Sequence, residues 1–246
     1  MKFYGSSKTG PVRSSNQDAF FALQLQSGVF IAAVCDGMGG AAAGNVASKT
    51  AVKIISEQLK TSFAALPDED FDSIGEIKKS FSDADDGIRE LVVKHPDYAG
   101  MGTTAVLIVA YDEKAYVAHI GDSRCYNVSA ESETLTRLTK DHSYVQMLID
   151  NNEITESEAE KHPNKNIITR SIGGMAKASP DVILTKAKGQ FLLCSDGLTN
   201  YVTEDRILEI MISVPSPQKA VNKLVSEAIK NGGGDNVTAL IVDFSK

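Results

Sequence analysis

Short apolar runs of strand length recur along the chain, and longer segments with helical spacing separate them. The runs are rich in Val, Ile, Phe and Tyr, which favour strands. Strands are predicted at 17–25, 29–35, 103–111, 114–120, 134–139, 182–187, 190–194 and 237–244. Helices are predicted at 43–62, 70–93, 143–151, 203–213 and 217–230. Because the strands are too many and too closely spaced for a helical bundle, we expect an α+β fold with an antiparallel core.

Two local signals refine this pattern. Only Asp112 and Glu113 connect the predicted strands 103–111 and 114–120, and so short a connection joins antiparallel neighbours in a hairpin. Thr155 followed by Glu158 is a capping box, which opens one helical turn. That turn lies within 151–181, a polar segment and the least core-like part of the chain.

Composition and charge exclude several classes of protein. The 246 residues are 42% apolar and 23% charged, as in an ordinary globular protein, and no repeat or linker divides 1–246. A net charge of -7 without a basic cluster argues against nucleic-acid binding. No apolar run approaches the roughly 20 residues of a membrane span, and no secretory signal is recognisable. The three cysteines show no paired spacing and are expected to be buried thiols in a reducing compartment. Together, these observations predict a single domain in the cytoplasm.

Four aspartates stand at the ends of apolar strands and carry the candidate chemistry. Asp36, Asp122 and Asp196 each follow such a run, and Asp235 precedes the last one. Each alone is typical of a turn, but together they are expected to converge on one rim, where buried carboxylates need a cation. Oxygen ligands without a His or Cys cluster favour Mg²⁺ or Mn²⁺. Two such ions can share a water and prepare a hydroxide for attack on phosphorus.

A nucleotide-binding protein is a rival hypothesis. Gly37, Gly39 and Ala42 follow a strand and precede a helix with the spacing of a dinucleotide fingerprint. Asp36, however, would repel the pyrophosphate, and the other strand-end aspartates would be left unexplained. Gly39 and Gly44 have the spacing of a P-loop, but Asn45 stands where that motif requires lysine.

Seven short motifs occur in order from about residue 5 to 244. They are Gly10-x-x-Arg13-x-x-Asn16-Gln17-Asp18, Asp36-Gly37-Met38-Gly39-Gly40, Gly102-Thr103-Thr104, Gly121-Asp122-Ser123-Arg124, Asp141-His142-Ser143, Ser195-Asp196-Gly197 and Gly234-Asp235-Asn236-Val237-Thr238. The series resembles that of the PPM family, the metal-dependent protein phosphatases of type 2C. The resemblance implies two stacked antiparallel β-sheets flanked by helices on both outer faces, an α-β-β-α sandwich. It also implies hydrolysis of phosphoserine and phosphothreonine in other proteins.

The resemblance assigns ligands to two tightly held Mg²⁺ or Mn²⁺ ions. Asp36 is similar to the carboxylate that bridges both ions, and Gly37 to the residue that lends its backbone carbonyl to the second. Asp196 and Asp235 match the remaining ligands of the first ion.

The same comparison implies supporting roles for other residues. Asp18 matches an acidic residue that acts largely through bound water, and Asn236 sits beside a ligand. Asp122 with Asp196 resembles a third, weaker metal site of bacterial members. Arg13 matches the phosphate-binding arginine, and its planar guanidinium suits the fork of phosphate oxygens.

The chain also departs from eukaryotic relatives of this family. Met38 and Gln17 stand where those relatives carry His and Glu, so no general acid is assigned at position 38. The four histidines are expected to be structural or exposed. His162 is the exception, because 151–181 resembles the variable flap near the active site and His162 could reach a leaving group from there.

A catalytically silent member of the fold that only binds phosphoproteins is the second alternative. Such a pseudophosphatase normally lacks some of the metal-ligand residues, whereas this chain has all four of those assigned above, Asp36, Gly37, Asp196 and Asp235. The sequence therefore favours an enzyme whose partners are phosphorylated proteins and, by family analogy, a cognate serine/threonine kinase.

Overall fold

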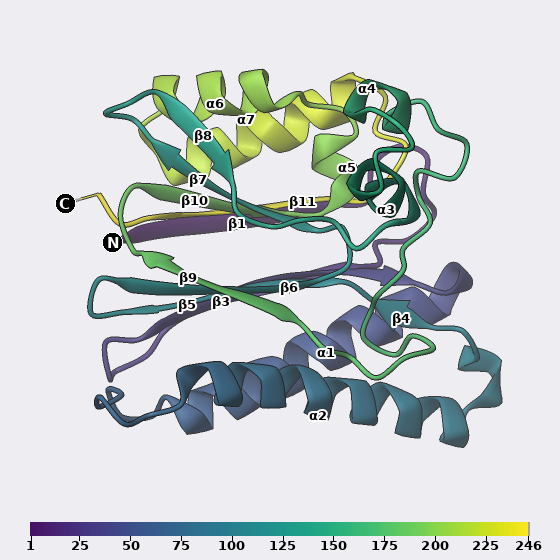
Figure 1. The fold of residues 1–246 in the computed structure, drawn as a ribbon, viewed down its shortest axis with the longest axis horizontal. Coiled ribbons are helices and arrows are strands. Elements are labelled where there is room, and N and C mark those ends of the chain that lie inside the picture. The colour runs from purple at the N-terminus through teal and green to yellow at the C-terminus, as the bar shows by residue number, and fades with distance from the viewer. Residues whose placement is uncertain (246) are drawn as a thin grey trace.

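The computed structural model describes residues 1–245, with the side chains of 41 and 42 left undescribed. Two β-sheets stack face to face, and a layer of helices covers the outer face of each, as Figure 1 shows. Helices α1 (Gly40–Ser62) and α2 (Ser73–Lys94) cover one sheet. Helices α6 (Glu204–Ser213) and α7 (Pro217–Lys230) cover the other. The predicted α-β-β-α sandwich is confirmed.

Every strand pairing within the two sheets is antiparallel. In order across it, the first sheet contains β1 (Lys2–Lys8), β11 (Val237–Asp243), β10 (Gln190–Cys194), β7 (Arg124–Ser129) and β8 (Thr134–Arg137). The second contains β2 (Asp18–Gln24), β3 (Phe30–Met38), β5 (Ala105–Tyr111), β6 (Lys114–Ile120) and β9 (Asp181–Lys186), with the short β4 (Gly102–Thr103) paired to β3. The remaining helices are α3 (Tyr144–Asp150), α4 (Glu156–Ala159), α5 (Asp196–Thr199) and a 3-10 turn at Pro96–Tyr98. None of the helices in residues 1–245 combines the length and apolarity that crossing a membrane requires.

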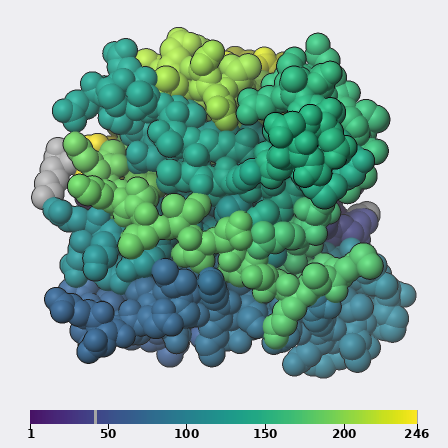
Figure 2. Space-filling view, in the orientation of Figure 1, coloured from purple at the N-terminus to yellow at the C-terminus, as the bar shows by residue number. Residues whose placement is uncertain are grey.

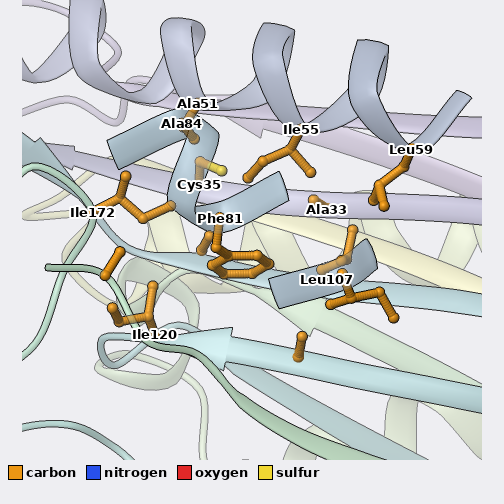
Figure 3. Packing of buried hydrophobic residues seen from close by; sticks show 14 of the residues in the cluster. Ala33, Cys35, Ala51, Ile55, Leu59, Phe81, Ala84, Leu107, Ile120 and Ile172 are labelled. Carbon is orange, nitrogen blue, oxygen red and sulfur yellow. The ribbon is translucent and has the colours of Figure 1, made fainter. Parts of the chain in front are cut away.

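Strand β3 shows why the predicted strands are apolar throughout rather than alternating. Ala33 and Cys35 face α1, where Figure 3 shows them near Ile55, whereas Ala32 and Val34 face the other sheet. Both faces of the strand are therefore buried, and each side chain removed from water contributes to folding. The same burial explains why all three cysteines are buried free thiols.

The sequence pattern misses β1 and β7 and merges two other strands. β1 is an edge strand with several half-exposed residues and little apolar character, and β7 contains Arg124 and Asn127. The predicted strand 103–111 is interrupted at Thr104, which donates its N–H to the carbonyl oxygen of Asp36 at 2.8 Å and accepts the Asp36 N–H at 3.0 Å. The interruption thus serves the end of β3 where the candidate site lies.

The two local signals are confirmed. Asp112 and Glu113 take φ values of 45° and 61°, the left-handed conformation of a two-residue hairpin that suits the twist of the strands. Thr155 and Glu158 form a reciprocal capping box at the start of α4.

The return part of segment 151–181 is fastened to α2. The fully buried carboxylate of Asp85 accepts N–H groups from Gly173 at 2.7 Å and Ala178 at 3.3 Å and pairs with Arg89 at 2.9 Å. Arg89 in turn donates to the carbonyl oxygen of Gly174 at 2.8 Å. Figure 2 shows this segment, in light green, on the surface beside α2 in blue.

We expect Asp85→Ala to lower the free energy of unfolding by about 1–3 kcal/mol, because two buried backbone donors lose their acceptor. Urea unfolding followed by circular dichroism measures this loss. Asp83→Ala is the matched control on the same helix, since the exposed Lys79–Asp83 pair should contribute at most about 1 kcal/mol. Equal losses in the two variants would contradict the anchoring role of Asp85.

Candidate active site

Strand ends from both sheets meet at one end of the sandwich around an open cleft of about 480 Å³. The second sheet supplies Asp36 near the end of β3 and Asp122 just after β6. The first sheet supplies Asp196 just after β10 and Asp235 just before β11. All four carboxylate residues line the cleft, so the structure brings together these residues from distant parts of the chain.

Close packing, rather than a turn conformation, explains the glycine in each of the dipeptides Asp36-Gly37 and Asp196-Gly197. A Cβ on Gly37 would lie 2.0 Å from the carbonyl oxygen of Gly44 in α1. A Cβ on Gly197 would lie 1.9 Å from the carbonyl oxygen of Asn236. Real Cβ atoms do not approach so closely, so only glycine lets the backbone pass at these points. The backbone around the acidic cluster is thereby held closely packed.

Asp18 joins the two sheets below the cleft. It faces Asp36 across the β2–β3 pair, and its carboxylate accepts hydroxyl bonds from Ser195 at 2.8 Å and Thr238 at 2.6 Å in the other sheet. Desolvation of this buried group raises the pKa of Asp18 to about 7, with smaller contributions from the charges of Asp196 and Asp235.

The carboxylates of the cluster repel one another. Desolvation raises the pKa of Asp122 to about 8, and the neighbouring charge of Asp196 adds to the effect. Desolvation and the surrounding carboxylates also raise the pKa values of Asp36 and Asp196. Ionising all of these groups together is therefore costly without a compensating positive charge.

Three buried carboxylate oxygens lack a hydrogen-bond partner among residues 1–245. They belong to Asp18, Asp122 and Asp196, and each is an Oδ1 atom. Asp122 and Asp196 line the cleft, and Asp18 lies below it. Unpaired carboxylate oxygens in such a place suit a bound cation, and an all-oxygen donor set suits Mg²⁺ or Mn²⁺. The residues present fit such ions.

Arg13 lies at the edge of this cluster. Its Nη2 donates to Asp235 Oδ2 at 2.7 Å, and about half of its side chain is exposed. Asn236 ties down the loop that carries it, since its Nδ2 donates to the carbonyl oxygens of Thr9 at 2.9 Å and Ser15 at 3.0 Å. Its Oδ1 accepts the Gln17 N–H at 2.7 Å. This anchoring of the arginine loop is a role for Asn236 that its position beside Asp235 does not reveal.

The flap contributes to the cleft at other positions than the predicted one. Asn166 and Ile168 line the cleft, as does Met38. His162 does not line it, and instead its Nδ1 accepts the Asn164 N–H at 3.1 Å within the flap.

An oxygen-rich acidic cleft with an arginine at its edge, at one end of this sandwich, defines a metal-dependent phosphatase type of site. Residues 12–230 match the family model described as protein phosphatase 2C. The serine/threonine phosphatase stp of Listeria welshimeri is 35% identical over 236 residues, covering 95% of this chain and 92% of the relative.

Solved structures give the same result. The serine/threonine phosphatase PstP/Ppp of Mycobacterium tuberculosis superimposes with a TM-score of 0.88 at 31% identity, covering 100% of this chain and 99% of that one. The catalytic domain of PstP in complex with 2 manganese ions superimposes at 0.85 with 32% identity, covering 98% and 97%. The chain therefore belongs to the protein phosphatase 2C family. Membership confirms the activity predicted from the sequence, that of a metal-dependent protein serine/threonine phosphatase, and the comparisons favour neither alternative.

The raised pKa values predict how the metal-free protein responds to pH. A carboxyl group whose pKa is raised to about 7 or 8 in the folded protein makes its full contribution to stability at pH values below its pKa in the unfolded chain. This contribution is lost progressively as the pH rises to the folded pKa. We therefore expect the melting temperature in EDTA to fall between about pH 4 and 8 and to level off above that, and Mn²⁺ to reduce the fall. Calorimetry over this pH range measures both curves. Parallel curves with and without Mn²⁺ would contradict the electrostatic account.

Proposed function

We propose that Asp36, the carbonyl oxygen of Gly37, Asp196 and Asp235 hold two Mg²⁺ or Mn²⁺ ions with which this chain hydrolyses phosphoserine and phosphothreonine. The observation that supports this most is the crowding of buried carboxylates with raised pKa values and unpaired oxygens at one cleft. When bound, such ions neutralise phosphate charge and lower the pKa of water. The relative solved with two manganese ions supports the ion count.

Arg13 binds the phosphate group of the substrate in this proposal. Its guanidinium already donates to a carboxylate oxygen of Asp235, and a phosphate oxygen offers the same kind of acceptor. Because the side chain is half exposed at the cleft, it can move from Asp235 to an incoming phosphate without crossing the core. Asn236 holds the loop so that Arg13 stays at the cleft.

Asp18 contributes beneath the ligands rather than beside the substrate. Its Oδ2 accepts the hydroxyl bonds from Ser195 and Thr238, while its Oδ1 has no partner among residues 1–245. This leaves one oxygen for a water that belongs to the metal cluster, as the family resemblance implies. The carboxylate thereby joins the two sheets and the metal site.

Protonation of the leaving group does not fall to position 38, since Met38 has no titratable group. His162 remains a candidate for that step only through movement of the flap, because it does not line the cleft. We propose that 1–246 act as one catalytic domain with 151–181 as its flap. Unpaired buried thiols support a cytoplasmic location, and a cognate serine/threonine kinase would supply the phosphorylated substrates.

The first test is hydrolysis of an aryl phosphate and a phosphothreonine peptide, with Mn²⁺ and with EDTA. We expect activity only with the metal, and we expect Asp36→Asn to lower kcat by at least about 100-fold because both ions depend on this carboxylate. Asp112→Asn, in the hairpin at the far end of β5, is the matched control and should keep full activity. Wild-type turnover by Asp36→Asn at saturating Mn²⁺ would refute the two-ion assignment.

We also propose that Asp122 and Asp196 hold a third, weaker ion. Asp122 has an unpaired buried oxygen, yet the tight pair of ions does not require it. Asp122→Ala should fold normally, keep two tight Mn²⁺ sites in a calorimetric titration and lose most activity on phosphopeptides. Full activity with one weak site fewer would show that the third ion has no part in turnover. A lower melting temperature with all sites retained would show that Asp122 only stabilises the turn.

A further inference from the structure

His142 lies between the Asp122 turn and the flap and makes hydrogen bonds to both. Its ring Nδ1 accepts the N–H of Gly121 at 3.1 Å, and its own N–H donates to the carbonyl oxygen of Gly121 at 2.9 Å. On the flap side, its carbonyl oxygen accepts the N–H of Thr169 at 2.8 Å. Its ring Nε2 lies 3.1 Å from Oδ2 of Asp181, the last residue of the flap.

These contacts determine where the ring carries its proton. Because Nδ1 accepts the Gly121 N–H, the proton of the neutral ring sits on Nε2 and points to Asp181. Arg170 orients the carboxylate that accepts this proton, because its Nη2 donates to Asp181 Oδ1 at 3.0 Å. Its Nη1 lies 2.8 Å from Nε2 of His142, a contact that is not a hydrogen bond while Nε2 carries the proton. Burial lowers the pKa of His142, and the stacked ring of His119 and the charge of Arg170 lower it further, which favours the neutral form.

A metal site at this position is less consistent with these contacts. One ligand atom each from His119, His142 and Asp181 lie within 4.8 Å of one another, and Nδ1 of His119 has no partner among residues 1–245. However, a metal on Nε2 of His142 would require the proton to move to Nδ1, where the Gly121 N–H already points. It would also have to displace the guanidinium of Arg170.

The two segments that His142 joins both face the cleft. Gly121 has a φ of 99° and immediately precedes Asp122, so its position sets where the Asp122 carboxylate lies. On the other side, Thr169 directly follows Ile168, which lines the cleft. Ile168 also forms an isolated bridge with Ser143. One buried imidazole therefore connects the residue before a cleft carboxylate to the part of the flap that lines the cleft.

We propose that His142 is a positioning residue that couples the flap to the Asp122 turn, because one side of its ring fixes the turn beside the weak metal site and the other side fixes the flap. This inference rests on the proposed metal role of Asp122. The Nδ1 side of the ring holds the turn, and the Nε2 side, through Asp181 and Arg170, holds the flap.

Two substitutions separate the two sides of the ring. In His142→Asn the amide oxygen can take the place of Nδ1 and still accept the Gly121 N–H, but the side chain is too short to reach Asp181. In His142→Gln the longer amide can reach Asp181 but leaves the Gly121 N–H without its acceptor. A residue with a purely structural role would respond to both changes in the same way.

We expect His142→Gln to raise the Kd of the weak Mn²⁺ site by roughly 3- to 10-fold, the effect of losing one hydrogen bond. His142→Asn should leave that Kd unchanged and instead raise KM for a phosphothreonine peptide by a similar factor. Its kcat at saturating Mn²⁺ and its activity on a small aryl phosphate, which does not reach the flap, should stay at wild-type values. Equal changes in metal affinity in the two variants, or none in either, would overturn the proposal.

Asp181→Ala tests the flap side without altering the buried ring, because the Asp181 side chain is about half exposed. This variant should raise the peptide KM as His142→Asn does. It also tests the proposal if the histidine variants fail to fold, because an unchanged peptide KM would refute the coupling. Asp122→Ala distinguishes this inference from the proposed function. If that variant keeps the weak site, the metal role of Asp122 is wrong; if it loses the site while His142→Gln keeps native affinity, only the coupling is wrong.

Discussion

The cost of ionising carboxylates that are withdrawn from water and crowded together at one end of the sandwich is the constraint on which the rest of this structure depends. Asp36, Asp122 and Asp196 are held together by a rigid framework, and each has a raised pKa because ionisation in this place is unfavourable. A fold selected for stability alone would separate such groups or pair them with basic residues. Protonation relieves this cost at low pH, whereas at higher pH a bound cation is needed to offset it, and that requirement connects the fold to catalysis.

The sandwich is suited to holding these groups because the site spans the contact between its two sheets. Asp18 and Asp36 come from one sheet, whereas Asp196 and Asp235 flank strands of the other. The hydroxyls of Ser195 and Thr238 connect the two sets directly through Asp18. Relative sliding of the sheets would therefore disturb the proposed metal ligands, and the well-packed apolar layer between the sheets prevents it.

The elements that the sequence predicts well are those buried on two faces. The run at 29–35 is apolar at every position because β3 packs on a helix layer and a sheet at once. The predicted start lies within one residue of the true one, but the strand continues through Asp36 to Met38. The hydrophobic pattern did not predict β1, because an edge strand that is half exposed to water can contain Gly, Ser and Lys. Strand-end aspartates could be recognised because each stands next to such a run.

Other parts of the site depend on contacts between residues distant in sequence, which one sequence does not reveal. Asp85 looks like one of several acidic residues on a helix, yet it is fully buried beneath the flap. His142 looks like a surface histidine beside Asp141, and its link to Gly121 appears only when two loops meet. The cleft-facing flap residues are Asn166 and Ile168 rather than His162, because backbone bridges of the folded flap decide which residues face inward.

The central claim is that this acidic cleft is a manganese or magnesium site, and anomalous diffraction from crystals grown with Mn²⁺ tests it most directly. We expect two strong peaks bounded by the carboxylates of Asp36, Asp196 and Asp235 and the carbonyl oxygen of Gly37. Anomalous density confined to His119 and His142, or its absence from the cleft at saturating Mn²⁺, would contradict the account.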